Sequence, residues 1–216
     1  MNMKKAIRLL VLASVSTYLF VCAPASQMFE QRMGSEDVTV RREAAKELRA
    51  QPRDSRLVPV ILQACRDPDA DVRTYGFYAI GRVDARADEG VVGTLIAGMS
   101  DTSVQVRRAV ASSMGSLNPF PNTCTPHLVK MLVDPDEKVR KFTFSAVADL
   151  GRDAMGSLIR NIDSKDEKMR VAVINVLAQI GEPAKSTLPK LRQIAREDPN
   201  EEARSAAERA VKFIGE

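Results

Sequence analysis

The sequence offers few side chains for catalysis or metal binding, and His127 is its only histidine. Zinc sites built on histidine clusters and serine–histidine catalysis both need this side chain beside fixed partners. His127 follows Pro126 near the start of a predicted helix, and the sequence assigns it neither a nucleophile nor a carboxylate. We therefore expect His127 to be a surface or packing residue, and we predict no catalytic residue and no cofactor.

Asp67, Asp69 and Asp71 are spaced like the start of a calcium-binding loop. Such a loop needs glycine at its sixth position and glutamate at its twelfth, but Val72 and Tyr78 stand there. A turn followed by a helix N-cap accounts for the aspartates better. The sequence therefore predicts no bound metal.

An arginine that recurs at a nearly constant interval is the dominant pattern of the chain. Successive copies are 30 to 34 residues apart: Arg41, Arg73, Arg107, Arg140, Arg170 and Arg204. Four positions before each copy stands a residue type that caps helix N-termini: Asp37, Asp69, Ser103, Asp136, Asp166 and Asn200. Seven positions after each copy stands an apolar residue: Leu48, Ile80, Met114, Val147, Leu177 and Val211. A fixed period of this size, with apolar residues at helical spacing, predicts a stack of helical repeats.

A second helix is predicted before each of the later arginine helices. These segments also carry apolar residues at helical spacing: 56–65, 91–99, 125–133, 154–162 and 187–196. No segment shows the period-two alternation of a strand. We call the arginine helix of each pair the B helix and its partner the A helix, and we expect an all-α protein.

The details of these pairs resemble the HEAT-repeat family, in particular the short bacterial HEAT-like repeats also seen in phycobilisome lyases. The resemblance is carried by Asp-Pro-Asp at 67–69 and 134–136, Val-Arg at 72, 106 and 139, and glycines after the B helices. Pro59 and Pro126 match a proline of the family's A helix. The resemblance implies a right-handed α-solenoid of about five to six helical hairpins over residues 35–216.

In the HEAT family, the repeated arginine and an aspartate six residues before it form a ladder between successive repeats. The resemblance therefore implies a structural ladder of Asp67, Arg73, Asp101, Arg107, Asp134, Arg140, Arg170, Asp198 and Arg204. Ser35 and Ser164 replace the acid in two copies. Since the arginine fork can donate several hydrogen bonds at once, we predict that Arg140→Ala destabilises the fold and leaves the binding face in place.

Cys65 and Cys124 are the two cysteines after the N-terminal segment. Cys65 occupies an apolar position of its A helix, so we predict a buried free thiol. The two residues lie two repeats apart, which places them beyond the Cα separation of about 7 Å that a disulfide allows. We therefore predict no disulfide between them.

Residues 1–25 are typical of an export signal: a basic start, an uncharged run and the small residues Ala23-Pro24-Ala25. The run is shorter than the roughly 20 residues of a transmembrane helix. We predict cleavage near Ser26 and a periplasmic or secreted protein. The alternative is membrane attachment through an uncleaved signal or a lipidated Cys22.

Removing this segment leaves an almost neutral chain. The sequence holds 32 basic and 28 acidic residues, and three of the basic ones, Lys4, Lys5 and Arg8, lie in the segment, which leaves 29. Near neutrality and export both argue against a nucleic-acid partner. Residues 26–34 are then a short N-terminal segment, which we expect either to form a half-repeat cap or to dock on another chain.

The exposed side of the B helices is the expected binding surface, because solenoids present it as a continuous wall. Positions one, five and nine after the arginine supply a basic set with one aromatic ring: Arg42, Lys46, Tyr78, Arg82, Arg108 and Lys141. Phe77, Phe142 and Phe144 are expected instead to fill gaps between helices. We predict a non-enzymatic scaffold whose concave B-helix wall binds a protein or peptide, with an acidic segment as our hypothesis. The alternative is a lyase-like enzyme or accessory protein that binds a small molecule.

Overall fold

The computed structural model describes residues 25–51, 54–82, 89–117 and 122–215, and these residues form helices and connecting turns without a strand. The A-helix layer consists of α2 (Ala25–Met33), α4 (Val58–Cys65), α6 (Glu89–Gly98), α8 (Thr125–Lys130), α10 (Met155–Asn161) and α12 (Leu188–Glu197). The B-helix layer consists of α3 (Val38–Ala50), α5 (Ala70–Ile80), α7 (Val104–Met114), α9 (Glu137–Leu150), α11 (Glu167–Ile180) and α13 (Glu201–Gly215). Short 3₁₀ turns adjoin several A helices: η1 (Ser55–Leu57), η2 (Asn122–Cys124), η3 (Met131–Val133), η4 (Gly151–Ala154) and η5 (Glu182–Thr187).

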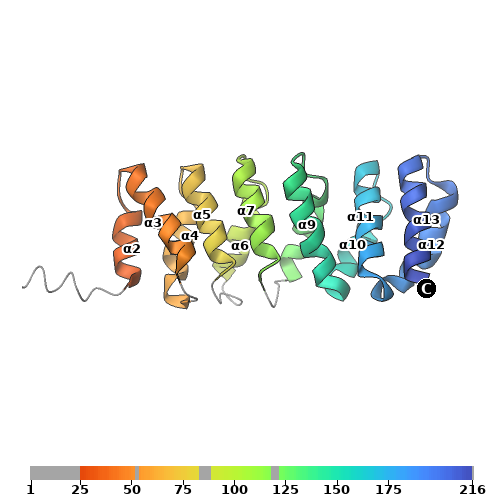
Figure 1. Ribbon diagram of the computed structural model, residues 1–216, viewed down its shortest axis with the longest axis horizontal. Coiled ribbons are helices and arrows are strands. Elements are labelled where there is room, and N and C mark those ends of the chain that lie inside the picture. The colour runs from red at the N-terminus through yellow and green to blue at the C-terminus, as the bar shows by residue number, and fades with distance from the viewer. Residues whose placement is uncertain (1–24, 52–53, 83–88, 118–121, 216) are drawn as a thin grey trace, which may run out of the picture.

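The helical pairs stack side by side in one elongated row (Figure 1). Each inner B helix packs against its own A helix and against the B helices before and after it, as α5 does with α4, α3 and α7. The A helices pack along one another as a second layer, of which α6, α10 and α12 lie behind the B helices in this view. The all-α solenoid expected from the arginine period is confirmed.

Capping side chains start most of the B helices. The carboxylates of Asp37, Asp69, Asp136 and Asp166 accept hydrogen bonds from amides of the first helical turn, and the Asn200 side chain does the same for α13. Ser103 is the N-cap residue of α7, as its register predicts, but its side chain makes no capping hydrogen bond. Gly151 and Gly181 end α9 and α11 at positive φ, a conformation that glycine adopts without steric cost.

The apolar positions of the B helices form the core that runs through the row. Val72, Val106 and Val139, each directly before an arginine, are fully buried, and so are Leu177 and Ile80 further along their helices. Because each inner B helix packs between two other B helices, neighbouring repeats depend on each other. The row is therefore held by contacts between repeats as well as within them.

The N-terminal segment is the A helix of a complete first hairpin. Helix α2 packs against α3 and α4. Its Phe29 and Met33 are buried, and Arg32 pairs with Glu47 of α3. The described residues therefore make six hairpins, of which residues 26–34 supply part of the first.

The predicted signal at 1–25 lies outside the described residues except for its last position. Within the described ranges, no helix has the length and apolar character to cross a membrane.

Candidate functional site on the B-helix face

An arginine–aspartate ladder joins four pairs of neighbouring repeats. In each rung, the arginine Nε and Nη2 donate to the two carboxylate oxygens of the next repeat at 2.7 to 3.2 Å. The rungs are Arg41–Asp67, Arg73–Asp101, Arg107–Asp134 and Arg170–Asp198. These two-point charged hydrogen bonds fix the geometry between repeats as well as supplying energy.

Each rung also fastens the turns on either side of it. Arg73 Nη1 donates to the carbonyl oxygens of Asp67 and Pro68 in its own turn. The receiving carboxylate of Asp101 accepts the amide of Ser103 as well. The arginine therefore connects the turn before its own helix to the turn before the next B helix, which is a structural use of the side chain.

The ladder is interrupted once inside the row, between α9 and α11. Arg140 Nη1 donates to the carbonyl oxygens of Asp134 and Pro135, at 2.7 and 2.9 Å, as in the other repeats. Ser164 stands where a carboxylate would receive Nε and Nη2, and its Oγ accepts only the amide of Asp166. Across the described ranges Arg140 forms no ion pair, and Arg204 of the last hairpin forms none either.

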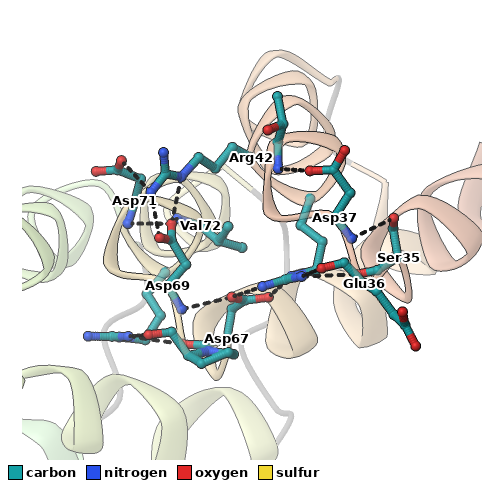
Figure 2. A network of polar contacts seen from close by, with 12 residues as sticks. Ser35, Glu36, Asp37, Arg42, Asp67, Asp69, Asp71 and Val72 are labelled. Atoms are coloured by element: carbon teal, nitrogen blue, oxygen red, sulfur yellow. Dashed lines mark hydrogen bonds and ion pairs between the residues drawn. The ribbon is translucent and has the colours of Figure 1, made fainter.

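A second row of ion pairs involves two residues that the sequence placed on the binding surface. Arg42 donates to both carboxylate oxygens of Asp69 at 3.0 and 2.6 Å, and Arg108 does the same with Asp136. Figure 2 shows Arg42 reaching Asp69 and Asp71 at the start of α5. Since Asp69 and Asp136 are N-caps, these arginines hold the start of the next B helix. The expectation that both are available to a partner needs correction for this reason.

The arginines change the acidity of these caps. Hydrogen bonds from Arg42 lower the pKa of Asp69 to about 2, against the opposing effect of burial. Arg108 likewise holds the pKa of Asp136 below its usual range. Burial raises the pKa of Asp101, but hydrogen bonds from Arg73 and the Ser103 amide outweigh it, so this pKa also lies below its ordinary value.

These shifts predict acid destabilisation. A carboxyl group whose pKa is lower in the folded state stabilises the fold above its unfolded pKa, near 4, and this contribution is lost as pH falls toward the folded value. We expect the melting temperature to fall as pH decreases from about 4 to about 2. In Asp69→Asn, which can still cap α5, the melting temperature should decrease less over that range. Glu201→Gln on α13 is the control and should follow wild type.

The other predicted contact residues remain on the surface. Lys46, Arg82 and Lys141 are exposed, and none forms an ion pair with another described residue. Tyr78 is half-buried, with the Arg49 guanidinium 4.6 Å from the centre of its ring. This stacking holds Tyr78 and Arg49 together as one amphipathic patch on the N-terminal half of the B-helix layer.

A groove of about 790 Å³ lies between α9 and α11 and extends to Glu202 at the start of α13. Its basic lining consists of Arg140, Lys141 and Lys168, and its acidic lining of Asp134, Glu137 and Glu202. Its apolar lining includes Phe144, Val171 and Ala172. Helices α9 and α11 are also set further apart than the other successive B helices (Figure 1), and they pack together less extensively. Phe144, expected to fill a gap between helices, is thus half-buried in the wall of a groove.

Neither predicted thiol is placed for chemistry. Cys65 and Cys124 are buried and free, and burial raises the pKa of Cys124 to about 11. His127 is exposed. Within the described ranges, histidine, cysteine and acidic side chains form no cluster that could hold a metal ion.

Comparison with known proteins agrees with this architecture. Solved structures with similar folds include an engineered protein (TM-score 0.57, 18% identity, 89% of this chain and 97% of that one). A designed armadillo repeat protein in complex with the peptide (KR)4 matches with TM-score 0.54 and 17% identity, over 89% of this chain and all of that one. The complex of CpcE and CpcF of phycocyanin lyase from Nostoc sp. PCC7120 matches with TM-score 0.51 and 18% identity, over 85% and 75%.

At these identities the structural matches show the fold alone. A search of curated proteins found no match. The family model for HEAT repeats, in contrast, matches residues 26–115 and 125–212, which is most of the chain. Together with six stacked hairpins and the arginine ladder, this match shows that the chain belongs to the HEAT-repeat family.

Proposed function

We propose that this chain is an exported, non-enzymatic scaffold that binds a protein or peptide segment on its B-helix face. The groove between α9 and α11 carries the proposal, because it offers basic, acidic and apolar side chains in a single depression of about 790 Å³. Recognition of a peptide uses this combination, with apolar contacts for affinity and placed charges for orientation. The designed armadillo protein solved with the peptide (KR)4 is a protein of similar fold with a peptide bound.

The contact surface that we propose differs from the one expected from sequence. Arg42 and Arg108 are withdrawn from it because carboxylates of this chain already occupy their guanidinium groups. Lys46, Tyr78, Arg82 and Lys141 are retained, since they are exposed or half-exposed on the B-helix layer. A basic set of this kind favours an acidic partner.

Photocrosslinking tests the binding face. A photoreactive phenylalanine analogue at position 144, in the groove, should give an adduct with a protein in intact cells. The same analogue at Ile159 of α10, which is 48% exposed in the A-helix layer, is the control and should give none. Adducts formed equally from both positions, or only from position 159, would contradict the proposal.

Export is tested separately from binding. If the signal is cleaved as proposed, the native protein purified from cells will begin at Ser26. An intact N-terminus in a protein that stays inside the cell would rule out this part of the proposal.

A small-molecule accessory role, related to the lyase-like alternative, is a second candidate. The groove volume favours it, because small-molecule sites usually measure about 300 to 1,000 Å³. Titration with a bilin distinguishes the two candidates: a shift in bilin absorbance that saturates, and that Phe144→Ala weakens, would support the accessory role.

A further inference from the structure

Among the ladder arginines of the described residues, Arg140 is the one inside the row that lines a groove and has no aspartate on its Nε and Nη2 atoms. In the four rungs, Nη1 donates to the carbonyls of the arginine's own turn, while Nε and Nη2 donate to the carboxylate of the next repeat, as in Arg73. Arg140 keeps the first half of this arrangement, with Nη1 on Asp134 and Pro135. Its guanidinium is therefore held by its own turn, and the residue lines the groove between α9 and α11.

The groove supplies the surroundings of a binding site for a charged peptide side chain. Arg140 lies in its lining with Lys141 and Lys168, and none of the three forms an ion pair with a described residue, so they can attract a negative charge. Phe144 and Val171 provide apolar surface for the neighbouring residues of a peptide. The two aspartates that precede Arg140 in its own turn, Asp134 and Asp136, are already paired with Arg107 and Arg108 and do not compensate Arg140.

We propose that the Nε–Nη2 edge of Arg140 binds the side-chain carboxylate of an aspartate or glutamate in a partner segment, which completes the ladder from outside the chain. This inference rests on the proposed function and names the chemistry that the groove recognises. In the four rungs of this chain, the equivalent edge of the arginine donates to an aspartate carboxylate at 2.7 to 3.2 Å.

A single carboxylate suits this groove better than a phosphate group. Asp134, Glu137 and Glu202 also line the groove, and a group of higher negative charge would be repelled more strongly by them. The other rungs hold their carboxylate on a side chain, with the backbone running past the arginine. A side chain inside a segment reproduces that arrangement, whereas a free chain end does not.

The test uses displayed libraries of short peptides that carry either aspartate or asparagine at the central position and are otherwise random. Selection on the full mature chain should enrich binders from the aspartate library. The affinity of a selected peptide should decrease about tenfold or more on Arg140→Ala, and equally when its aspartate is changed to asparagine. Arg204→Ala is the matched control, since Arg204 makes the same two carbonyl hydrogen bonds, lacks an ion pair and does not line the groove.

Ser164→Asp is a second test that leaves Arg140 intact. It restores the acid of the ladder, which should compete with the peptide and weaken binding about tenfold or more. A peptide that ends at the aspartate position, with alanine there in place of aspartate, offers only its terminal carboxylate. Binding of this peptide should be abolished. Peptides that bind Arg140→Ala and Ser164→Asp as tightly as wild type would overturn the inference. Equal enrichment from the aspartate and asparagine libraries, or no enrichment from either, would overturn it as well.

The outcomes separate this inference from the proposed function. If selected peptides bind but lose affinity only on Tyr78→Ala or Arg82→Ala, the B-helix face binds peptides and the Arg140 site is wrong. If instead neither library yields a binder and crosslinking from position 144 yields no protein, the proposed function fails together with the inference.

Discussion

Replacing Arg107 with alanine is expected to lower the free energy of unfolding by about 3 kcal/mol. The Arg107 and Asp134 side chains are only 15% and 8% exposed, so the substitution leaves a largely buried carboxylate without its partner. It also removes hydrogen bonds to the carbonyls of Asp101 and Thr102. The loss of an interaction between repeats should weaken the whole row, since each repeat is stable only on its neighbours. Urea unfolding followed by circular dichroism measures the effect.

Arg140→Ala is the matched control for this prediction. Arg140 has the same register and the same pair of carbonyl hydrogen bonds, but its removal leaves no carboxylate without a partner. We expect a loss of about 1 kcal/mol, so the difference between the two variants measures the rung itself. Equal losses would show that the ion pairs between repeats contribute nothing beyond the hydrogen bonds within each turn.

Replacing Gly98 with alanine is expected to lower the free energy of unfolding by about 2 kcal/mol through overpacking. A Cβ at this position would lie 2.3 Å from Phe77 Cζ and 2.7 Å from Val110 Cγ2. Phe77 is 1% exposed and fills the space between α5 and its neighbours, as the sequence predicted for this ring. Because the ring is enclosed, it can move away only by displacing other core residues.

Gly93→Ala in the same helix provides the control for Gly98→Ala. No atom lies within 4 Å of a Cβ built at Gly93, so alanine should leave stability unchanged or raise it by about 0.5 kcal/mol through helix propensity. Shortening the opposing ring by Phe77→Leu should cost less in the Gly98→Ala background than in wild type. Additive effects of the two substitutions would contradict a direct steric conflict.

The helical row could be predicted from sequence because its signals are local. Asp136 lies four residues before Arg140, and both belong to one helix start, so spacing alone locates the helix. The ladder partners could be named only through the family resemblance, since rungs join residues 26 to 28 positions apart on different hairpins. No local sequence pattern predicts that an arginine and an aspartate on different hairpins form an ion pair.

The role of Arg42 and Arg108 could not be predicted for the same reason. Each lies one position after a ladder arginine, which places it toward solvent on its own helix. Its guanidinium reaches the N-cap carboxylate of the next repeat because neighbouring B helices pack close together, and the sequence does not show this packing. In sequence, both positions look like exposed basic residues suited to a partner.

One feature of the sequence indicated the groove at Arg140. Ser164 stands six residues before the repeated arginine, where four other repeats have aspartate. The sequence showed the departure but not its consequence. That consequence depends on the space between α9 and α11, and packing between helices determines that space.

The most direct test of the central claim is the effect of Ser164→Asp on the protein adduct formed from position 144. Ser35→Asp is its matched control, because Ser35 occupies the same register and its Oγ accepts the Asp37 amide at 3.2 Å, as that of Ser164 does for Asp166. We predict that Ser164→Asp raises the melting temperature and abolishes the adduct, while Ser35→Asp leaves the adduct unchanged. An adduct of wild-type yield in Ser164→Asp would contradict the claim that the missing rung is where the partner binds.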